Sequence, residues 1–396
     1  SYGRFRRQHP ELLIGRPGEI IPENTVEWGL RSGKDYAFPQ VRDYALGIIC
    51  ESFERWDVDG VELDFMRHPG WFRIEEAYQN RYLMTDLIRE VKTRLKEVGD
   101  DRNKSLDLAV RVPPTIHDSV RTGLDVQEWI SEGLVDIVIV GGGFIPFDTP
   151  VKEFVKVAED TDCLIYGCIE ATRSADEDLI IALSNRWLNE GASGIYLYNF
   201  YTMSADWNKN IFDKISDVSS LKKLSKRYEL GTTGGFYPSE GHGCGFRYAS
   251  PPAQLPVTMT SHPSNPYTPL YIEVNDNLIE ATSDNTLDIC TLSLRFDKLS
   301  REDKFDVKVN DQNIPWSSAK LSLQGWERMQ LTGLFWMEYP STIEPKPQEG
   351  SSVEFNLFCP PLKEGQNKIE VRLCGSENNE IHQVTLKGVE ISISYK

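Results

Sequence analysis

The chain has 396 residues, which is enough for two or three domains of ordinary size. Hydrophobic residues make up 40% and charged residues 26%, as in globular proteins, and no apolar run approaches the roughly 18 residues that a membrane span needs. The formal net charge is −17. It argues against nucleic acid or an anionic membrane as a partner, because both repel an acidic chain. A neutral partner such as a carbohydrate substrate fits this charge, whereas the oligomeric state is not predicted.

Neither the cysteines nor the first residues of the chain indicate a functional site. An odd number of cysteines without CxxC spacing argues against a zinc site or a dense disulfide framework, so we interpret most of them as apolar core residues. The chain begins at Ser1 with neither Met nor an apolar signal-peptide core. We interpret it as processed or as a fragment, and a secreted or periplasmic location is favoured if a signal peptide preceded Ser1. The seven cysteines are Cys50, Cys163, Cys168, Cys244, Cys290, Cys359 and Cys374.

From about residue 40 to residue 215, predicted helices and strands alternate. Apolar residues at helical spacing predict helices, and short continuous apolar runs between them predict strands. Buried strands that alternate with amphipathic helices indicate a parallel sheet with both faces covered. The predicted helices are 41–56, 75–98, 124–132, 151–159 and 176–189, and the predicted strands are 58–66, 106–112, 135–140, 163–169 and 194–200.

Two parallel architectures compete for this pattern. A dinucleotide-binding sheet needs a glycine-rich loop after its first strand and an acidic residue about 20 positions later. The glycines at 141–143 follow the third strand and lack that acidic residue, so we interpret them as a turn or a place of close ligand approach. A (β/α)8 TIM barrel needs eight strands. We predict such a barrel over 1–225 with its first two or three strands before Ser1, and an open sheet is the alternative.

The pattern changes after about residue 225. Residues 231–256 are rich in Gly, Pro and Ser, and we predict a linker or long loop over 226–265. Short alternating strands follow at the spacing of an all-β sandwich, which we predict over 266–396. These strands are 270–274, 290–296, 306–309, 329–335, 353–358, 368–373 and 384–395.

The first predicted strand carries the most informative residues. Alternation along a strand places Glu62 and Asp64 on one face. Two carboxylates on the inward face of a buried strand are costly to desolvate, so they indicate a place where something binds or reacts. Asp64 lies nearer the C-terminal end, where barrel active sites lie, and Arg67 and His68 follow at the mouth. The structural alternative is a carboxylate network paired with arginine.

A second carboxyl group comes from Glu170, at the end of the fourth predicted strand. Glycoside hydrolysis commonly uses two carboxyl groups, one protonated and one ionised. We therefore predict Asp64, Glu62 and Glu170 as catalytic candidates. Their separation, which distinguishes retention from inversion, cannot be obtained from sequence. The alternative for Glu170 is a substrate hydrogen bond or a solvated loop.

Several other residues near strand ends are candidates for substrate binding. Arg111 could hold a sugar hydroxyl or lower a carboxylate's pKa, or form a structural ion pair. Asn199 and His68 could bind hydroxyl groups. Aromatic rings after strand ends could stack on sugars, or pack on one another: Trp71, Phe72, Phe144, Tyr201 and Trp207. We expect no cofactor and no metal, because alternation turns Glu62 and Asp64 away from the loop geometry that calcium prefers.

The segment 57–69, DVDGVELDFMRHP, together with HPELLIG at 9–15, resembles the TIM-barrel glycosyl-hydrolase-like proteins described as family-10-like in bacteria. The resemblance covers roughly residues 5–205. It implies that 58–66 is the fourth barrel strand and 163–169 the seventh, with three strands before Ser1. It also implies that Asp64 or Glu62 is the acid/base and Glu170 the nucleophile.

Two further resemblances refine the hypothesis. The same segment is similar to the chitinase-type signature, but Met66 stands where that signature has its proton-donating Glu, which argues against chitinase-type substrate-assisted chemistry. The segment 361–371 resembles the β-sandwich accessory domains of sugar-active enzymes. We therefore predict a glycoside hydrolase that acts on a poly- or oligosaccharide. The alternatives are a non-catalytic carbohydrate-binding protein on a degenerate barrel and a sugar lyase or isomerase.

Overall fold

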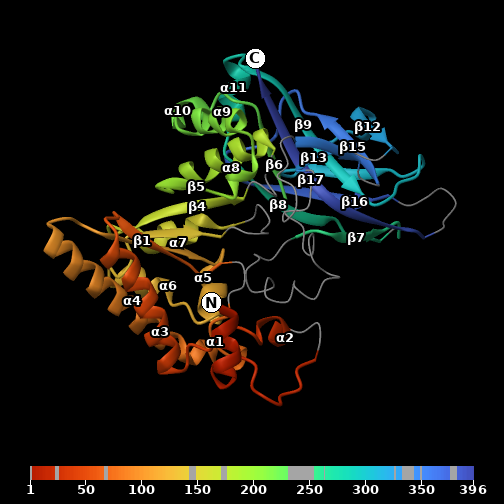
Figure 1. Cartoon of the computed structure of the whole chain (residues 1–396). Coiled ribbons are helices and arrows are strands. Elements are labelled where there is room, and N and C mark those ends of the chain that lie inside the picture. The colour runs from red at the N-terminus through yellow and green to blue at the C-terminus, as the bar shows by residue number, and fades with distance from the viewer. Residues whose placement is uncertain are drawn as a thin grey trace.

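The chain folds into a mixed α/β half followed by an antiparallel β half (Figure 1). Within the described ranges, no helix is long and apolar enough to cross a membrane. The computed structural model describes residues 2–22, 26–66, 70–141, 149–170, 176–230, 254–262, 264–324, 327–331, 343–347, 350–374 and 381–396.

The first half contains a five-stranded sheet in which every pair of neighbours is parallel. The strands lie in chain order, β1-β2-β3-β4-β5, without the reversal of order that defines a doubly wound dinucleotide-binding sheet. All five predicted strands are confirmed. They are β1 (Gly60–Asp64), β2 (Asp107–Val112), β3 (Ile137–Val140), β4 (Leu164–Glu170) and β5 (Gly194–Tyr198).

Helices connect these strands, and the five predicted ones are confirmed as α3 (Pro39–Arg55), α4 (Ile74–Arg102), α6 (Val126–Ser131), α7 (Val151–Ala158) and α8 (Glu177–Asn189). Several begin with a capping side chain. Asp125 accepts a hydrogen bond from the Glu128 backbone N–H, and Asp176 accepts one from that of Leu179. Short helices that the apolar pattern did not predict are α1 (Tyr2–Gln8), η1 (Pro10–Leu12), α2 (Val26–Leu30), α5 (Ile116–Arg121), η2 (Phe200–Thr202), α9 (Ala205–Ile215) and α10 (Val218–Leu221).

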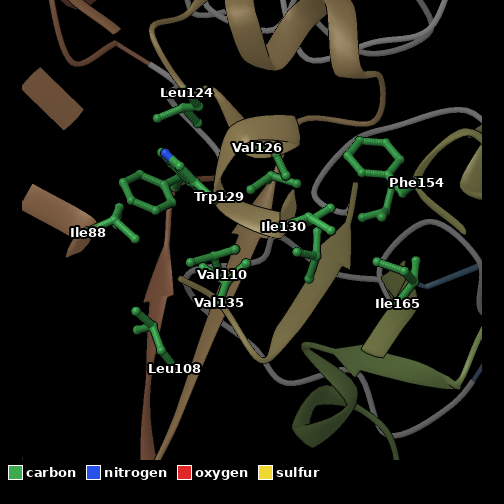
Figure 2. Close-up of a cluster of buried hydrophobic side chains, with 14 of the residues drawn as sticks. Ile88, Leu108, Val110, Leu124, Val126, Trp129, Ile130, Val135, Phe154 and Ile165 are labelled. Atoms are coloured by element: carbon green, nitrogen blue, oxygen red, sulfur yellow. The ribbon is translucent and has the colours of Figure 1, made fainter. Parts of the chain in front are cut away.

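One face of the parallel sheet is apolar and carries these helices. Every second residue of β2 and β3 is aliphatic and buried, including Leu108 and Val110, and Ile165 of β4 joins them. Figure 2 shows these side chains packed against Trp129 of α6 and Phe154 of α7. Because the helices cover this face, the polar side chains of the alternate positions lie on the other face.

The sheet is strongly curled. β1 and β5 form its two ends, and four strand spacings of about 4.8 Å would separate them by roughly 19 Å in a flat sheet. Yet the Tyr196 hydroxyl of β5 lies 3.1 Å from a carboxylate oxygen of Glu62 on β1. The sheet is therefore a curled half-barrel with the helices on its convex face. In the described part of the chain, no further strand pairs with its two ends, so the predicted closed barrel is not seen there.

A glycine in β4 allows α8 to approach the convex face closely. The ring of the buried Trp187 lies directly over Gly167, where an added Cβ would overlap the indole. We expect Gly167→Ala to lower the free energy of unfolding by about 1–3 kcal/mol, because the ring must move out of a packed core. Urea unfolding followed by tryptophan fluorescence measures this. Gly47→Ala, at a helical position with open space around it, is the control and is expected to be neutral or stabilising.

The second half consists of antiparallel sheets, and the seven predicted strands are present there, although 329–335 is described only to residue 331. The six-stranded sheet contains β12 (Ala319–Ser322), β15 (Ser351–Asn356), β9 (Leu287–Phe296), β17 (Gln383–Tyr395), β6 (Lys226–Glu229) and β7 (Val257–Thr260). The four-stranded sheet contains β11 (Gln312–Ile314), β10 (Phe305–Val309), β16 (Gly365–Leu373) and β8 (Thr268–Val274). The remaining elements are the pair β13 (Glu327–Leu331) and β14 (Ile343–Pro347) with the short helices α11 (Leu278–Ser283) and η4 (Trp316–Ser318).

A separate apolar core joins the two larger antiparallel sheets. Leu292 and Leu294 of β9 contribute to it from one sheet, and Ile369 and Val371 of β16 from the other. Two of the strands, β6 and β7, come from the range expected to be a linker, and both pair with β17. β6 also packs against α8 and so connects the antiparallel half to the parallel sheet.

The described cysteines are all free thiols. Cys50, Cys168 and Cys290 are buried, as expected of core residues, whereas Cys359 is exposed. Cys244 lies outside the described residues.

Candidate functional site

The two carboxylates of β1 lie on the concave face of the half-barrel. Glu62 and Asp64 alternate with the apolar Val61 and Leu63, as predicted from strand geometry. Both residues have solvent-exposed side chains, which differs from the expected full burial inside a closed barrel. The expectation assumed a closed barrel, whereas β1 and β5 are the two ends of an open sheet in the described part of the chain.

Asp64 forms a bidentate ion pair with Arg111 of β2. Nε of Arg111 lies 2.8 Å from Oδ1 and Nη2 lies 2.6 Å from Oδ2, and the register aligns the two residues. Oδ1 also accepts the backbone N–H of Met66 at 2.9 Å. Burial alone would lower the pKa of Arg111, but the hydrogen bonds and charge of Asp64 outweigh it and raise the pKa. Asp64 is therefore bound to a buried guanidinium by two charge-assisted hydrogen bonds, as in the arginine-paired alternative.

Glu62 has a different partner, Tyr196 of β5. The phenol oxygen lies 3.1 Å and 3.2 Å from the two carboxylate oxygens. Desolvation in the concave face raises the pKa of Glu62 even though part of the carboxyl is exposed to solvent. The Tyr196 hydrogen bond and the Arg111 charge lower that pKa, and the nearby Asp64 charge raises it, so that the net direction is upward. Glu62 thus holds its proton to higher pH than an ordinary glutamate does.

Two tyrosines of β5, which the sequence did not single out, complete this arrangement. The Tyr198 ring lies under the Arg111 guanidinium, 3.8 Å from ring centroid to Cζ. Arg111 is completely buried, and its Nη1 lies 3.9 Å from the Cys168 sulfur of β4. The alternation in GIYLY at 194–198 places both tyrosines on one face, and this signal is visible in the sequence.

Glu170 ends β4, and its backbone pairs in register with Tyr198. The end of β4 is thus beside the end of β5, on the same edge of the sheet as Asp64. The side chain of Glu170 lies outside the described part of the structure, as do Arg67, His68 and Phe144. Glu170 as the second catalytic carboxyl group therefore stays a prediction.

Trp71 and Phe72 are engaged in packing. The Trp71 ring makes edge-on contacts with Tyr36 and Phe65, with centroids 5.4 Å and 5.2 Å apart. Phe72 is buried in the helix-covered core. Trp207 packs on Phe200 with centroids 5.8 Å apart. These three rings pack against other aromatic or core residues, which agrees with the alternative to sugar stacking.

Asn199 and Tyr201 follow the end of β5. Asn199 is buried and has a left-handed backbone (φ 60°), which turns the chain sharply after the strand. Tyr201 is 67% exposed, so much of its side chain is accessible to solvent. In the described ranges, no three His, Cys, Asp or Glu side chains gather closely enough to hold a metal ion.

Comparisons with known proteins give only distant likenesses. No family model matches the chain, and no curated protein matches it. A cell-surface-expressed multi-modular chitinase of a Paenibacillus strain matches 94% of this chain at 9% identity and a TM-score of 0.36. The chain spans 44% of that chitinase.

Two further solved structures are similarly remote. A family 18 chitinase of Chromobacterium violaceum matches 98% of this chain and 78% of its own at 11% identity and a TM-score of 0.30. A family 86 β-porphyranase of Bacteroides plebeius matches 81% of this chain and 75% of its own at 8% identity and a TM-score of 0.23. These structural neighbours are glycoside hydrolases, weakly matched, and at such scores they carry no conclusion about catalysis in this chain.

Proposed function

We propose that the chain is a glycoside hydrolase that acts on a poly- or oligosaccharide, with Glu62 as its proton donor. The observation that carries the proposal is the state of the two carboxylates on the concave face. Asp64 is paired with the Arg111 guanidinium through two hydrogen bonds, whereas the partly exposed Glu62 has a raised pKa. One protonated and one ionised carboxyl group is the combination that glycoside hydrolysis commonly requires.

The proposed reaction follows from these roles. Glu62 gives its proton to the glycosidic oxygen as the bond between that oxygen and the anomeric carbon breaks. The positive charge that develops on the sugar is stabilised by carboxylates nearby, of which Asp64 is one. Glu170 is the proposed second catalytic carboxyl group, either as nucleophile or as the base that activates water. Water supplies a hydroxyl group to the anomeric carbon. If Glu170 is the nucleophile, the remaining water proton returns to Glu62; if Glu170 is the base, it takes that proton and Glu62 is reprotonated from solvent.

The proposal includes a specific architecture for each half of the chain. We interpret β1 to β5 as consecutive strands of a (β/α)8 barrel, because they are parallel, lie in chain order and carry helices on the convex face. We interpret the antiparallel half as a β-sandwich, because two sheets enclose one apolar core. The resemblance of 57–69 to family-10-like glycosyl-hydrolase-like proteins agrees with this interpretation.

Substrate contacts are proposed around the same edge of the sheet. Tyr201 is the best-exposed ring near the end of β5 and can stack on a sugar. Arg67 and His68, directly after β1, are proposed to bind hydroxyl groups. Asn199 is proposed to act from the turn that follows β5. The net charge of −17 favours neutral sugars over anionic ones.

The test is a panel of aryl glycosides and neutral polysaccharides, with released phenol and reducing ends as readouts. Glu62→Gln, Asp64→Asn and Glu170→Gln are each expected to lower turnover at least about a hundredfold. Glu159→Gln changes an exposed carboxyl group after α7 and is the matched control, expected to leave turnover unchanged. Turnover that survives all three substitutions would refute the site. Saccharide binding without any turnover would instead support the carbohydrate-binding alternative.

A further inference from the structure

We propose that Tyr196 is a positioning residue that holds the Glu62 carboxyl from across the concave face. This inference rests on the proposed function, and it adds a residue that the paired-carboxylate chemistry does not require. Glu62 and Tyr196 lie 134 residues apart in the chain and come from the two ends of the sheet. Their contact therefore exists only because the sheet curls.

The geometry fixes the carboxyl in two respects. The phenol oxygen is almost equidistant from the two carboxylate oxygens, at 3.1 Å and 3.2 Å. A single phenol proton shared in this way restrains rotation of the carboxyl plane. A phenol can also accept a hydrogen bond, so that it remains a partner when Glu62 is protonated. The exposed side of Glu62 is left for a ligand.

β5 supports both carboxylates of β1. Tyr196 contacts Glu62 directly, and two residues later the Tyr198 ring packs against Arg111, which holds Asp64. The Glu62 and Asp64 carboxyl groups are thus both held by side chains that β5 supplies or supports. A shift of β5 changes both together, which makes this strand the structural support of the site.

The groups that face Glu62 predict how its pKa changes when the Tyr196 phenol oxygen is removed. Asp64 on the same strand favours the protonated form, whereas Arg111 of β2 and the Tyr196 hydrogen bond favour the carboxylate. Burial keeps Tyr196 itself a neutral phenol, because its pKa is raised. Removing the phenol oxygen takes away one of the groups that favours the carboxylate. Glu62 then holds its proton to higher pH.

The test compares Tyr196→Phe with the wild-type chain by NMR titration of 13C-labelled glutamate carboxyls, with the Glu62 signal assigned from Glu62→Gln. We expect the Glu62 midpoint to move to higher pH in Tyr196→Phe. Tyr166→Phe removes a phenol oxygen from the neighbouring β4 and is the control, with an unchanged midpoint expected. An unchanged midpoint in Tyr196→Phe overturns the proposal, whatever the activity.

Kinetics separate this inference from the proposed function. If the chain hydrolyses glycosides, Tyr196→Phe is expected to lower kcat about 10- to 100-fold with little change in KM, because a misplaced acid acts only on the chemical step. A raised KM with unchanged kcat would overturn the positioning role and would indicate that Tyr196 binds the substrate. A shifted midpoint in a chain without hydrolase activity supports the positioning role and refutes only the proposed function.

A second measurement applies if Tyr196→Phe does not fold. Site-specific 3-fluorotyrosine at position 196 retains the phenol, and its 19F signal reports the charge of its neighbour. We expect the signal to move with pH over the Glu62 titration range and to stop doing so in Glu62→Gln. A 19F signal that does not change with pH in either protein would overturn the proposed contact between Tyr196 and Glu62.

Discussion

Replacing Asp276 with alanine is expected to lower the free energy of unfolding by about 3–5 kcal/mol, the largest stability change that we predict. Asp276 lies between β8 and α11 and accepts three hydrogen bonds in a buried position. Lys226 Nζ lies 2.9 Å from Oδ1, the Tyr395 hydroxyl 2.5 Å from Oδ1 and the Tyr228 hydroxyl 2.5 Å from Oδ2. Removing the carboxylate leaves a completely buried lysine without its counter-charge.

This cluster also connects the two halves of the molecule. Asn185 of α8 donates one hydrogen bond to the Tyr228 hydroxyl and one to the Asn275 backbone carbonyl. Lys226 and Tyr228 belong to β6, which pairs with β17 in the antiparallel half. Loss of Asp276 is therefore expected to loosen the contact between α8 and the antiparallel sheets.

The midpoint of urea unfolding, followed by circular dichroism, measures the effect. Asp288→Ala, at an exposed position of β9, is the control and is expected to change the free energy of unfolding by less than about 0.5 kcal/mol. Burial lowers the pKa of Lys226, whereas the charge of Asp276 raises it. The pKa of Lys226 is therefore expected to fall further in the Asp276→Ala variant. The variant is expected to regain stability as pH rises through the depressed folded-state pKa of Lys226 toward the unfolded value of 10.5, because the folded protein loses this charge first. A variant with the wild-type midpoint would show that the buried pair is not formed.

Replacing Glu62 with glutamine is expected to lower kcat on unactivated glycosides by about 10²- to 10⁴-fold, the contribution of a positioned general acid. Glutamine keeps the shape of the side chain and can accept from Tyr196, but it has no proton to give. In the wild-type chain, activity is expected to fall as pH rises through the raised pKa of Glu62, because the acid must be protonated. That alkaline limb is expected to disappear in Glu62→Gln.

The pH profile of kcat/KM for both proteins measures this. Glu159→Gln, with an exposed carboxyl group outside the site, is expected to keep the wild-type profile. An alkaline limb that persists unchanged in Glu62→Gln would assign it to a different group, and the role of Glu62 would then be wrong.

The elements of the parallel half could be predicted because their signals are local. Aliphatic residues at every second position of β2 and β3 form the helix-covered face, and apolar residues at helical spacing in α4 and α8 pack on it. The same alternation correctly placed Glu62 and Asp64 on one face. It also made Arg111 a candidate partner, because its position in β2 is set by the same rule.

The contacts between distant strands could not be predicted. Curvature of the sheet decides whether Tyr196 reaches Glu62, and no local pattern encodes curvature. The expected burial of Glu62 and Asp64 was wrong because it assumed a closed interior. β6 escaped prediction because its sequence, KRYE, is polar. Lys226 of this strand can be buried because Asp276, 50 residues away, supplies the opposite charge.

The dependence of the Glu62→Gln defect on the leaving group tests the central claim most directly. An acid catalyst matters most when the departing oxygen is basic, and little when the departing phenol is already acidic. We therefore predict a large loss of kcat/KM with alkyl or phenyl glycosides and a nearly wild-type value with 2,4-dinitrophenyl glycosides. An equal loss with both classes of substrate would show that Glu62 binds or supports the sugar without donating the proton.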